Sequence, residues 1–295
     1  MRRGTAILLL LTTLLLIPMD HVPYAKASGT IKVMGISQET SQEILSTKKQ
    51  VAEEIRKGLL GRKKRIQINM KYSVLKKIQD MSAFLEDIEK SDDKATAKDA
   101  DYLQYSIKQW HIKTAWIEGG DATVTLDVVY KCSYEQEKKL DKAIKSAINS
   151  LELTGKTEYE KVKAIHDFII NNVSYDTTLS KTSAYDALIN QTAVCEGYAM
   201  AAYRMFTEAG LEAKIITGLG NGAPHAWNIV KVEEKWYNID LTWDDPVASN
   251  GDAMLTYDYF LKNSKEFTDH KRDAEYSTDK FLKEYTIAKT SYTLE

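Results

Sequence analysis

Residues 183–218 read SAYDALINQTAVCEGYAMAAYRMFTEAGLEAKIITG, and residues 225–246 read HAWNIVKVEEKWYNIDLTWDDP. In the first stretch Cys195 stands where a helix is expected to begin, because apolar residues recur behind it at helical spacing and Gly210 supplies a C-terminal stop. A thiol at a helix N-terminus meets the positive end of the helix dipole and unpaired N–H groups, which favour the thiolate. Cys195 is therefore a candidate nucleophile.

The second stretch predicts two antiparallel strands at 225–232 and 236–243. With a two-residue turn between them, His225 and Asp240 share one sheet face and lie diagonally opposite each other, within side-chain reach. A bulged turn or a one-residue slip would move Asp240 to the other face. In the first register Asp240 orients the imidazole of His225, which can serve as the base for Cys195.

Each of these residues also has a purely structural interpretation. A lone cysteine is more often a small buried hydrophobic residue than a nucleophile, and a lone histidine on a strand is more often a hydrogen-bonded structural residue. The order Cys195, His225, Asp240, with all three at the ends of predicted elements, raises the catalytic interpretation to an equal standing.

Together the two stretches resemble the transglutaminase-like superfamily, especially its secreted bacterial members with a papain-like fold. The similarity runs from about Glu158 to Pro246. The resemblance implies that Cys195 is the nucleophile, His225 the general base and acid, and Asp240 the orienting acid. It also implies acyl transfer from a carboxamide, through a cysteine thioester, to an amine or to water.

Further site residues are assigned more loosely. The backbone N–H of Cys195 is a natural oxyanion donor, and Gln191 could add a side-chain donor, as a glutamine does in papain-like enzymes. Its spacing differs from theirs, so Gln191 is equally well a turn residue. Trp227 and Trp243 could form walls of the acyl site or simply belong to the core. The block that ends at His270 also resembles such proteins.

Other polar residues are interpreted structurally. Cys132 continues an apolar strand face, so we expect it to be buried; a disulfide with the other cysteine is the less favoured alternative. Asp244 and Asp245 precede a proline and predict a turn rather than a metal site. His166 is expected to be structural, and His270 has no evident partner. We expect no metal and no cofactor.

Bulk composition excludes some classes of protein. The 295 residues include 40 Lys and Arg against 42 Asp and Glu, a formal net charge of −2. A strongly basic nucleic-acid binder is therefore excluded on bulk charge. The two cysteines exclude a disulfide-rich scaffold. The basic run at 62–65 predicts a solvated face, with docking on an anionic cell-wall polymer as the weaker alternative.

Residues 1–27 predict a secretory signal peptide. Arg2 and Arg3 precede an apolar run at 6–18, and Ala25-Lys26-Ala27 favours cleavage after Ala27. The run is shorter than the about 20 residues that span a bilayer. We expect a secreted, extracellular protein without a stable membrane anchor. Its expected partners are protein or peptide substrates, cell-wall-associated ones included, and not nucleic acid; the oligomeric state stays open.

The region before the catalytic stretch predicts helices and antiparallel strands. Residues 74–88 carry one apolar stripe and predict a single helix. Alternating residues at 110–116 and 124–130, with Gly119-Gly120 between them, predict a β-hairpin. The role of this region is not evident from the sequence.

We therefore predict an α+β protein in two parts after the signal peptide. Residues 28–152 form an accessory α+β region with antiparallel strands. Residues 153–295 form a papain-like, transglutaminase-core catalytic domain, in which the cysteine helix packs on an antiparallel sheet that carries His225 and Asp240.

Three functions follow from this prediction. The leading one is a secreted thiol enzyme that transfers acyl groups from glutamine carboxamides of proteins or cell-surface peptides. The second is a secreted cysteine peptidase or amidase with the same triad, in which water resolves the thioester. The third is a non-catalytic cell-surface or spore-coat binding module that keeps the fold.

Overall fold

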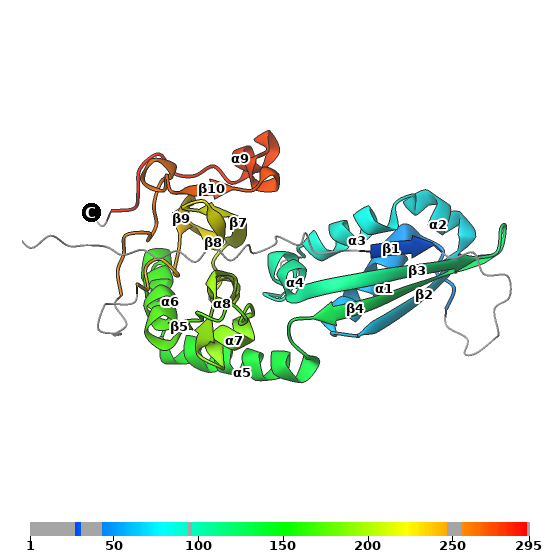
Figure 1. The fold of residues 1–295 in the computed structure, drawn as a ribbon, viewed down its shortest axis with the longest axis horizontal. Helices are drawn as coiled ribbons and strands as arrows, with labels where there is room; N and C mark the ends of the chain where they lie inside the picture. The colour runs from blue at the N-terminus through cyan, green and yellow to red at the C-terminus, as the bar shows by residue number, and fades with distance from the viewer. Residues whose placement is uncertain (1–26, 31–42, 94–95, 247–254, 294–295) are drawn as a thin grey trace, which may run out of the picture.

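The computed structural model describes residues 27–30, 43–93, 96–246 and 255–293 (Figure 1). The predicted signal peptide therefore lies outside the described residues, apart from Ala27. Within the described ranges, no helix combines the length and the apolar character needed to cross a membrane.

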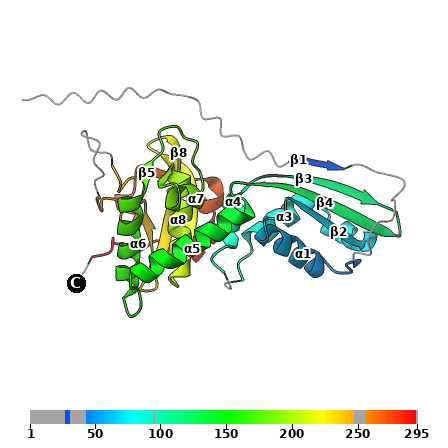
Figure 2. The same cartoon turned by 90° about the horizontal axis from the view of Figure 1, so that it is seen from below.

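The N-terminal part is a four-stranded sheet in the order β1-β3-β4-β2, with helices on one face (Figure 2). The predicted hairpin is confirmed, because β3 and β4 pair antiparallel from Ile107↔Tyr130 to Trp116↔Ala122. The first strand was not predicted and pairs parallel with β3, so the sheet is mixed. The strands are β1 Ala27–Thr30, β2 Arg65–Lys71, β3 Ile107–Trp116 and β4 Asp121–Tyr130.

In the described residues of this part four helices accompany the sheet, and one prediction here is wrong. The single helix expected over 74–88 is two helices, because Gln79 adopts a positive φ of 62° and breaks the helix. Asp80 then starts the next helix by accepting hydrogen bonds from the N–H groups of Ser82 and Ala83. The helices are α1 Lys48–Leu60, α2 Tyr72–Ile78, α3 Met81–Lys90 and α4 Ala100–Ser106.

The basic run at 62–65 is not uniformly solvated, contrary to the prediction. Arg62 is only 6% exposed. Its guanidinium donates to Ser106 and forms an ion pair with Glu137, at 2.9 Å between Nη2 and Oε1. Burying a charge is tolerated when a carboxylate compensates it, and Glu137 supplies that carboxylate.

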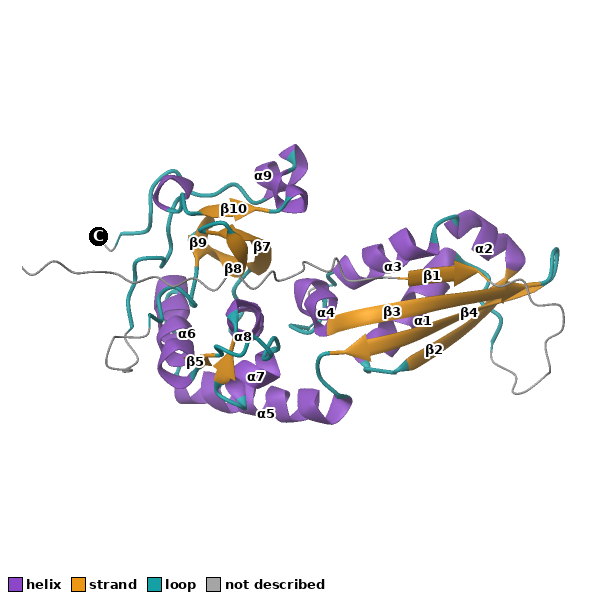
Figure 3. Cartoon of the chain, in the orientation of Figure 1, coloured by secondary structure: helices purple, strands orange, loops and turns teal. Residues whose placement is uncertain are grey.

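The C-terminal part combines a second sheet, in the order β10-β7-β8-β9, with helices packed on it (Figure 3). A separate two-stranded sheet pairs β5 with β6 in parallel. The strands are β5 Ser174–Tyr175, β6 Thr192–Ala193, β7 Ala213–Gly220, β8 Ala223–Val232, β9 Lys235–Ile239 and β10 His270–Arg272. The helices are α5 Tyr134–Ser150, α6 Glu158–Asn172, α7 Ala184–Leu188, α8 Cys195–Glu208 and α9 Asp279–Glu284, with 3₁₀ turns η1 Ser264–Glu266 and η2 Ala274–Ser277.

The register between β8 and β9 is the predicted one, with Val232 opposite Lys235. Glu233 and Glu234 form a two-residue turn with φ of 51° and 62°, and a type I′ turn requires positive φ at both central residues. The expectation that Asp240 lies in the sheet is wrong, because β9 ends one residue earlier. The chain turns there, since Asp240 accepts hydrogen bonds from the backbone N–H groups of the loop that follows.

Helix α8 lies at the centre of the C-terminal core. Ten consecutive residues, from Gly197 to Phe206, are buried. Leu140 and Ile144 of α5 pack in the same cluster, while a separate cluster fills the N-terminal part. The protein is thus a mixed α+β fold, and the buried α8 gives its N-terminal residue a fixed position. The boundary at 152–153 stays a prediction.

Candidate active site

Cys195 is the first residue of α8 and is partly exposed. The N-terminal turn of α8 sits closely against β6, because a Cβ added to Gly197 would lie 2.6 Å from the Cβ of Ala193 and 3.1 Å from the Ser183 carbonyl oxygen. Val194 precedes the helix and makes no side-chain cap. The thiol therefore stands at a rigid helix N-terminus whose N–H groups no N-cap side chain satisfies, as predicted.

His225 comes from β8, where it pairs with Gly218 of β7. Gly220 leaves room for its ring, since a Cβ there would lie 3.0 Å from His225 and 2.8 Å from the indole of Trp243. The His225 Nε2 lies 2.6 Å from Asp240 Oδ2. This confirms that the predicted histidine and aspartate meet, although the aspartate reaches the ring from a loop.

The electrostatic environment of His225 favours a protonated ring. Burial lowers the pKa of His225, but the Asp240 carboxylate and the Cys195 sulfur outweigh it and raise that pKa to about 10. The Cys195 sulfur contributes to this raised pKa and therefore lies near the ring, and since Nε2 faces Asp240, Nδ1 is the nitrogen left for Cys195. An imidazolium beside a sulfur favours the thiolate. The structure thus brings the three predicted residues together.

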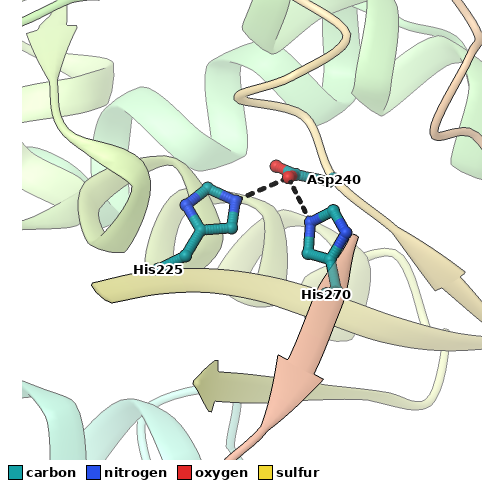
Figure 4. Close-up of side chains that lie close together, drawn as sticks. All are labelled: His225, Asp240 and His270. Carbon is teal, nitrogen blue, oxygen red and sulfur yellow. Dashed lines mark hydrogen bonds and ion pairs between the residues drawn. The ribbon is translucent and has the colours of Figure 1, made fainter. Parts of the chain in front are cut away.

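Asp240 is fully buried, and both of its carboxylate oxygens accept hydrogen bonds. Its Oδ1 accepts from the N–H groups of Thr242 and Trp243 at 3.0 and 3.3 Å. Its Oδ2 accepts from two imidazoles, His225 and His270 (Figure 4). Burial raises the pKa of Asp240, but the two histidines outweigh it and lower that pKa. The carboxylate is held ionised.

His270 corrects the expectation that this residue has no partner. It lies on β10, at the edge of the sheet next to β7, and its Nε2 is 3.0 Å from Asp240 Oδ2. The contact could not be predicted from the sequence, because His270 lies 30 residues after Asp240 and on a strand that was not predicted. The resemblance of the block ending at His270 was the one signal that could have indicated it.

The two tryptophans pack around the histidine. Trp243 is half-buried and stacks on His225 with ring centroids 5.0 Å apart and an interplanar angle of 28°. Trp227 is 1% exposed and stacks more distantly, at 6.1 Å. Both rings therefore restrict the imidazole, and only Trp243 also presents partly exposed surface. Their predicted role as walls of an acyl site stays a prediction.

Gln191 lies in an exposed turn with a positive φ of 54°. Its carbonyl oxygen accepts a hydrogen bond from the Ser174 N–H, which joins the turn to β5. The turn interpretation of Gln191 is confirmed, while its role as an oxyanion donor stays a prediction.

The remaining polar residues behave mostly as expected. Cys132 is buried, burial raises the pKa of its thiol, and both cysteines are free in the structure. His166 is buried and structural: its ring nitrogens meet Asp167 at 3.0 Å and Asp244 at 3.1 Å. Asp244 is thereby tied to helix α6 and, as predicted, belongs to a turn.

His225, Asp240 and His270 also place their ligand atoms within 4.8 Å of one another, which is close enough to hold a metal ion. However, the nitrogen–oxygen distances of 2.6 and 3.0 Å are those of direct hydrogen bonds. Two ligands about 2.1 Å from one tetrahedral zinc ion would lie farther apart. The geometry therefore fits protons better than a metal between these groups.

A family model matches the part of the chain that holds the site. The model of the transglutaminase-like superfamily matches residues 145–241, the range that holds Cys195, His225 and Asp240. The human protein named kyphoscoliosis peptidase is 28% identical over 132 residues, which cover 39% of this chain and 20% of that protein; the mouse protein of the same name is 27% identical. The chain thus matches about a fifth of the length of these relatives.

Two solved structures are similar to parts of this chain. A crystal structure of a TGase shares 19% identity and a TM-score of 0.35, covering 50% of this chain and 54% of that one. A candidate cysteine protease from Cytophaga hutchinsonii shares 25% identity and a TM-score of 0.30, covering 41% of this chain and 52% of that one.

Proposed function

Because the chain carries a transglutaminase-like superfamily domain at residues 145–241, we propose that it is a thiol enzyme that transfers acyl groups from carboxamides. The observation that carries the proposal is the contact series Cys195–His225–Asp240, in which a partly exposed thiol meets an imidazole that a buried carboxylate holds. A binding module that merely kept the fold would not need this series of contacts.

The proposed reaction has two halves. The Cys195 thiolate attacks the carbonyl carbon of a carboxamide; a carbon–sulfur bond forms, the carbon–nitrogen bond breaks, and His225 gives its proton to the departing ammonia or amine. An amine or water then attacks the thioester, His225 takes a proton from it, and the sulfur leaves as thiolate. In the proposed reaction the backbone N–H groups at the start of α8 stabilise the oxyanion.

A labelling experiment tests this proposal. The variant Cys132→Ala keeps Cys195 as the one thiol of the chain, and the buried Cys132 lies outside the site. We expect this variant to be alkylated by iodoacetamide at pH 7 much faster than free cysteine, and to form a thioester with a glutamine-peptide probe. Adding Cys195→Ala should abolish both. Alkylation no faster than that of free cysteine would reject the enzyme in favour of a binding module.

A cysteine peptidase or amidase is the second candidate. The name of the human and mouse relatives, kyphoscoliosis peptidase, favours it. A peptide library incubated with a labelled amine separates the two: incorporation of the amine indicates a transferase, and backbone cleavage indicates a peptidase. We further propose a secreted enzyme whose substrates are extracellular or cell-wall proteins and peptides; fractionation of cells that produce the protein tests its location.

A further inference from the structure

His270 lies between two carboxylates, and this placement indicates its charge. Its Nε2 is 3.0 Å from Asp240 Oδ2, and its Nδ1 is 2.9 Å from Asp269 Oδ1. The side chain is only 1% exposed, so water does not replace either partner. A neutral imidazole has one N–H and can donate to one of them, whereas an imidazolium donates to both. The two distances therefore fit the protonated ring.

The aromatic rings around His270 also suit a cation. Phe267 stacks on it with ring centroids 3.8 Å apart and an angle of 25°, and Trp243 lies 4.3 Å away. Aromatic faces attract positive charge, most strongly where water is excluded. On the other side, the Tyr259 hydroxyl donates to Asp269 Oδ2 at 2.7 Å and holds that carboxylate in place.

We propose that His270 is a protonated positioning residue, which shares the Asp240 carboxylate with His225 and weakens the hold of Asp240 on the His225 proton. The inference rests on the proposed function, because His225 must release that proton to a leaving group. If Asp240 accepted a hydrogen bond from His225 alone, His225 would keep its proton more firmly. A second cation on the same oxygen offsets part of that attraction.

The charges around His270 come from several elements. In the described part of the chain, Asp240 from the loop after β9, His225 from β8, Asp269 next to β10 and Tyr259 from the preceding loop are the titratable groups that face it. Burial and the hydrogen bond to Asp269 raise the pKa of Tyr259, which keeps this phenol neutral. The cluster thus holds two carboxylates and two imidazoles, so each histidine has a counter-ion.

The test is the pH dependence of Cys195 alkylation in the Cys132→Ala background. His270→Gln keeps an N–H donor for Asp240 but removes the charge. Without that charge the His225 imidazolium is less repelled and loses its proton at higher pH, and the thiolate is less stabilised and takes up a proton at higher pH. The lower limb of the profile reports the loss of the Cys195 proton, and the upper limb reports the loss of the His225 proton. Both limbs should therefore move to higher pH. For a charge at the 5.3 Å between the two rings, the expected shift is about 0.5 to 2 pH units.

The control is His111→Gln, which removes an exposed imidazole of strand β3 that contacts the Gln109 side chain and lies outside the site. It should leave both limbs unmoved. If His270→Gln folds and its limbs coincide with those of the parent, the proposal is wrong. Nitrogen NMR of the unmutated protein is a second test: both ring nitrogens of His270 should carry protons from pH 6 to 8, and a single N–H would overturn the proposal.

The outcomes also separate this inference from the proposed function. If the parent thiol reacts like free cysteine, the enzyme proposal fails, whereas the NMR signals of His270 still report its charge. If the parent thiol is fast and His270 is neutral, the enzyme proposal stands and this inference fails. Elemental analysis that finds one zinc per chain would also overturn it, because a metal would then occupy the place of the protons.

Discussion

At the scale of single residues, the site depends on one buried carboxylate that serves four donors. Asp240 accepts from two backbone N–H groups through one oxygen and from two imidazoles through the other. The backbone contacts fix the carboxylate, so its direction does not depend on the histidines. Asp240 can therefore orient the His225 ring before any substrate binds, which is the role of the third member of a catalytic triad.

Asp240→Asn should shift the alkylation profile in the direction opposite to His270→Gln. The amide removes the negative charge and turns an N–H₂ group toward donors, so the pKa of His225 falls from about 10; the loss of a neighbouring charge typically lowers it by about 1 to 3 units. The upper limb of the Cys195 alkylation profile, which reports the loss of the His225 proton, should move to lower pH by that amount. An upper limb that stays near pH 10 would show that Asp240 does not hold the His225 proton.

At the scale of elements, the loop after β9 is held to helix α6 by His166. This imidazole joins Asp167 of α6 to Asp244 of the loop, and stacks on Tyr257 at 5.3 Å. Asp244 in turn accepts from the Tyr259 backbone N–H. The same short loop thus carries Asp240 at its start and is anchored through Asp244, so helix α6 contributes to the position of the triad without touching it.

The stability that this bridge supplies should depend on pH. Burial lowers the pKa of His166, but Asp167 and Asp244 outweigh it and raise that pKa. A histidine with a raised pKa contributes its full stabilisation below the ordinary value of about 6.5 and loses it as pH rises through the folded-state value. His166→Gln should therefore lower the Tm more at pH 6 than at pH 10, as calorimetry can measure. If the difference in Tm between the variant and the parent were the same at both pH values, a charged His166 would be contradicted.

The elements also show what sequence reasoning could reach. The hairpin, the start of α8 and the register of β8 with β9 follow from local signals: paired glycines, a helical apolar stripe, and alternation that fixes which face is buried. The end of β9 does not follow from such local signals, because Asp240 turns the chain through hydrogen bonds to its own side chain. The edge strand that carries His270 is three residues long, too short to show alternation, so its contact with Asp240 depends on tertiary packing.

At the scale of the whole molecule, buried charges join the two cores. Glu137 of α5 forms an ion pair with Arg62 at 2.9 Å, lies 3.6 Å from Arg204 of α8, and accepts from the Tyr102 hydroxyl of α4. Segments of the N-terminal part thus meet the helix that begins at Cys195. Buried networks of this kind are sensitive to the loss of one member, because its partners stay charged and desolvated.

Glu137→Gln should therefore destabilise the whole protein and uncouple its two parts. Without the carboxylate, Arg62 loses its buried counter-ion, while Arg204 keeps its ion pair with Asp141 at 2.9 Å. Breaking a buried pair costs about 3 to 5 kcal/mol. We expect one cooperative unfolding transition in urea for the parent, and two for the variant. Asp127→Asn is the control, because its partner Arg65 is 66% exposed and such pairs contribute less than about 1 kcal/mol. Two transitions in the parent would show instead that the N-terminal part folds independently of the catalytic helix.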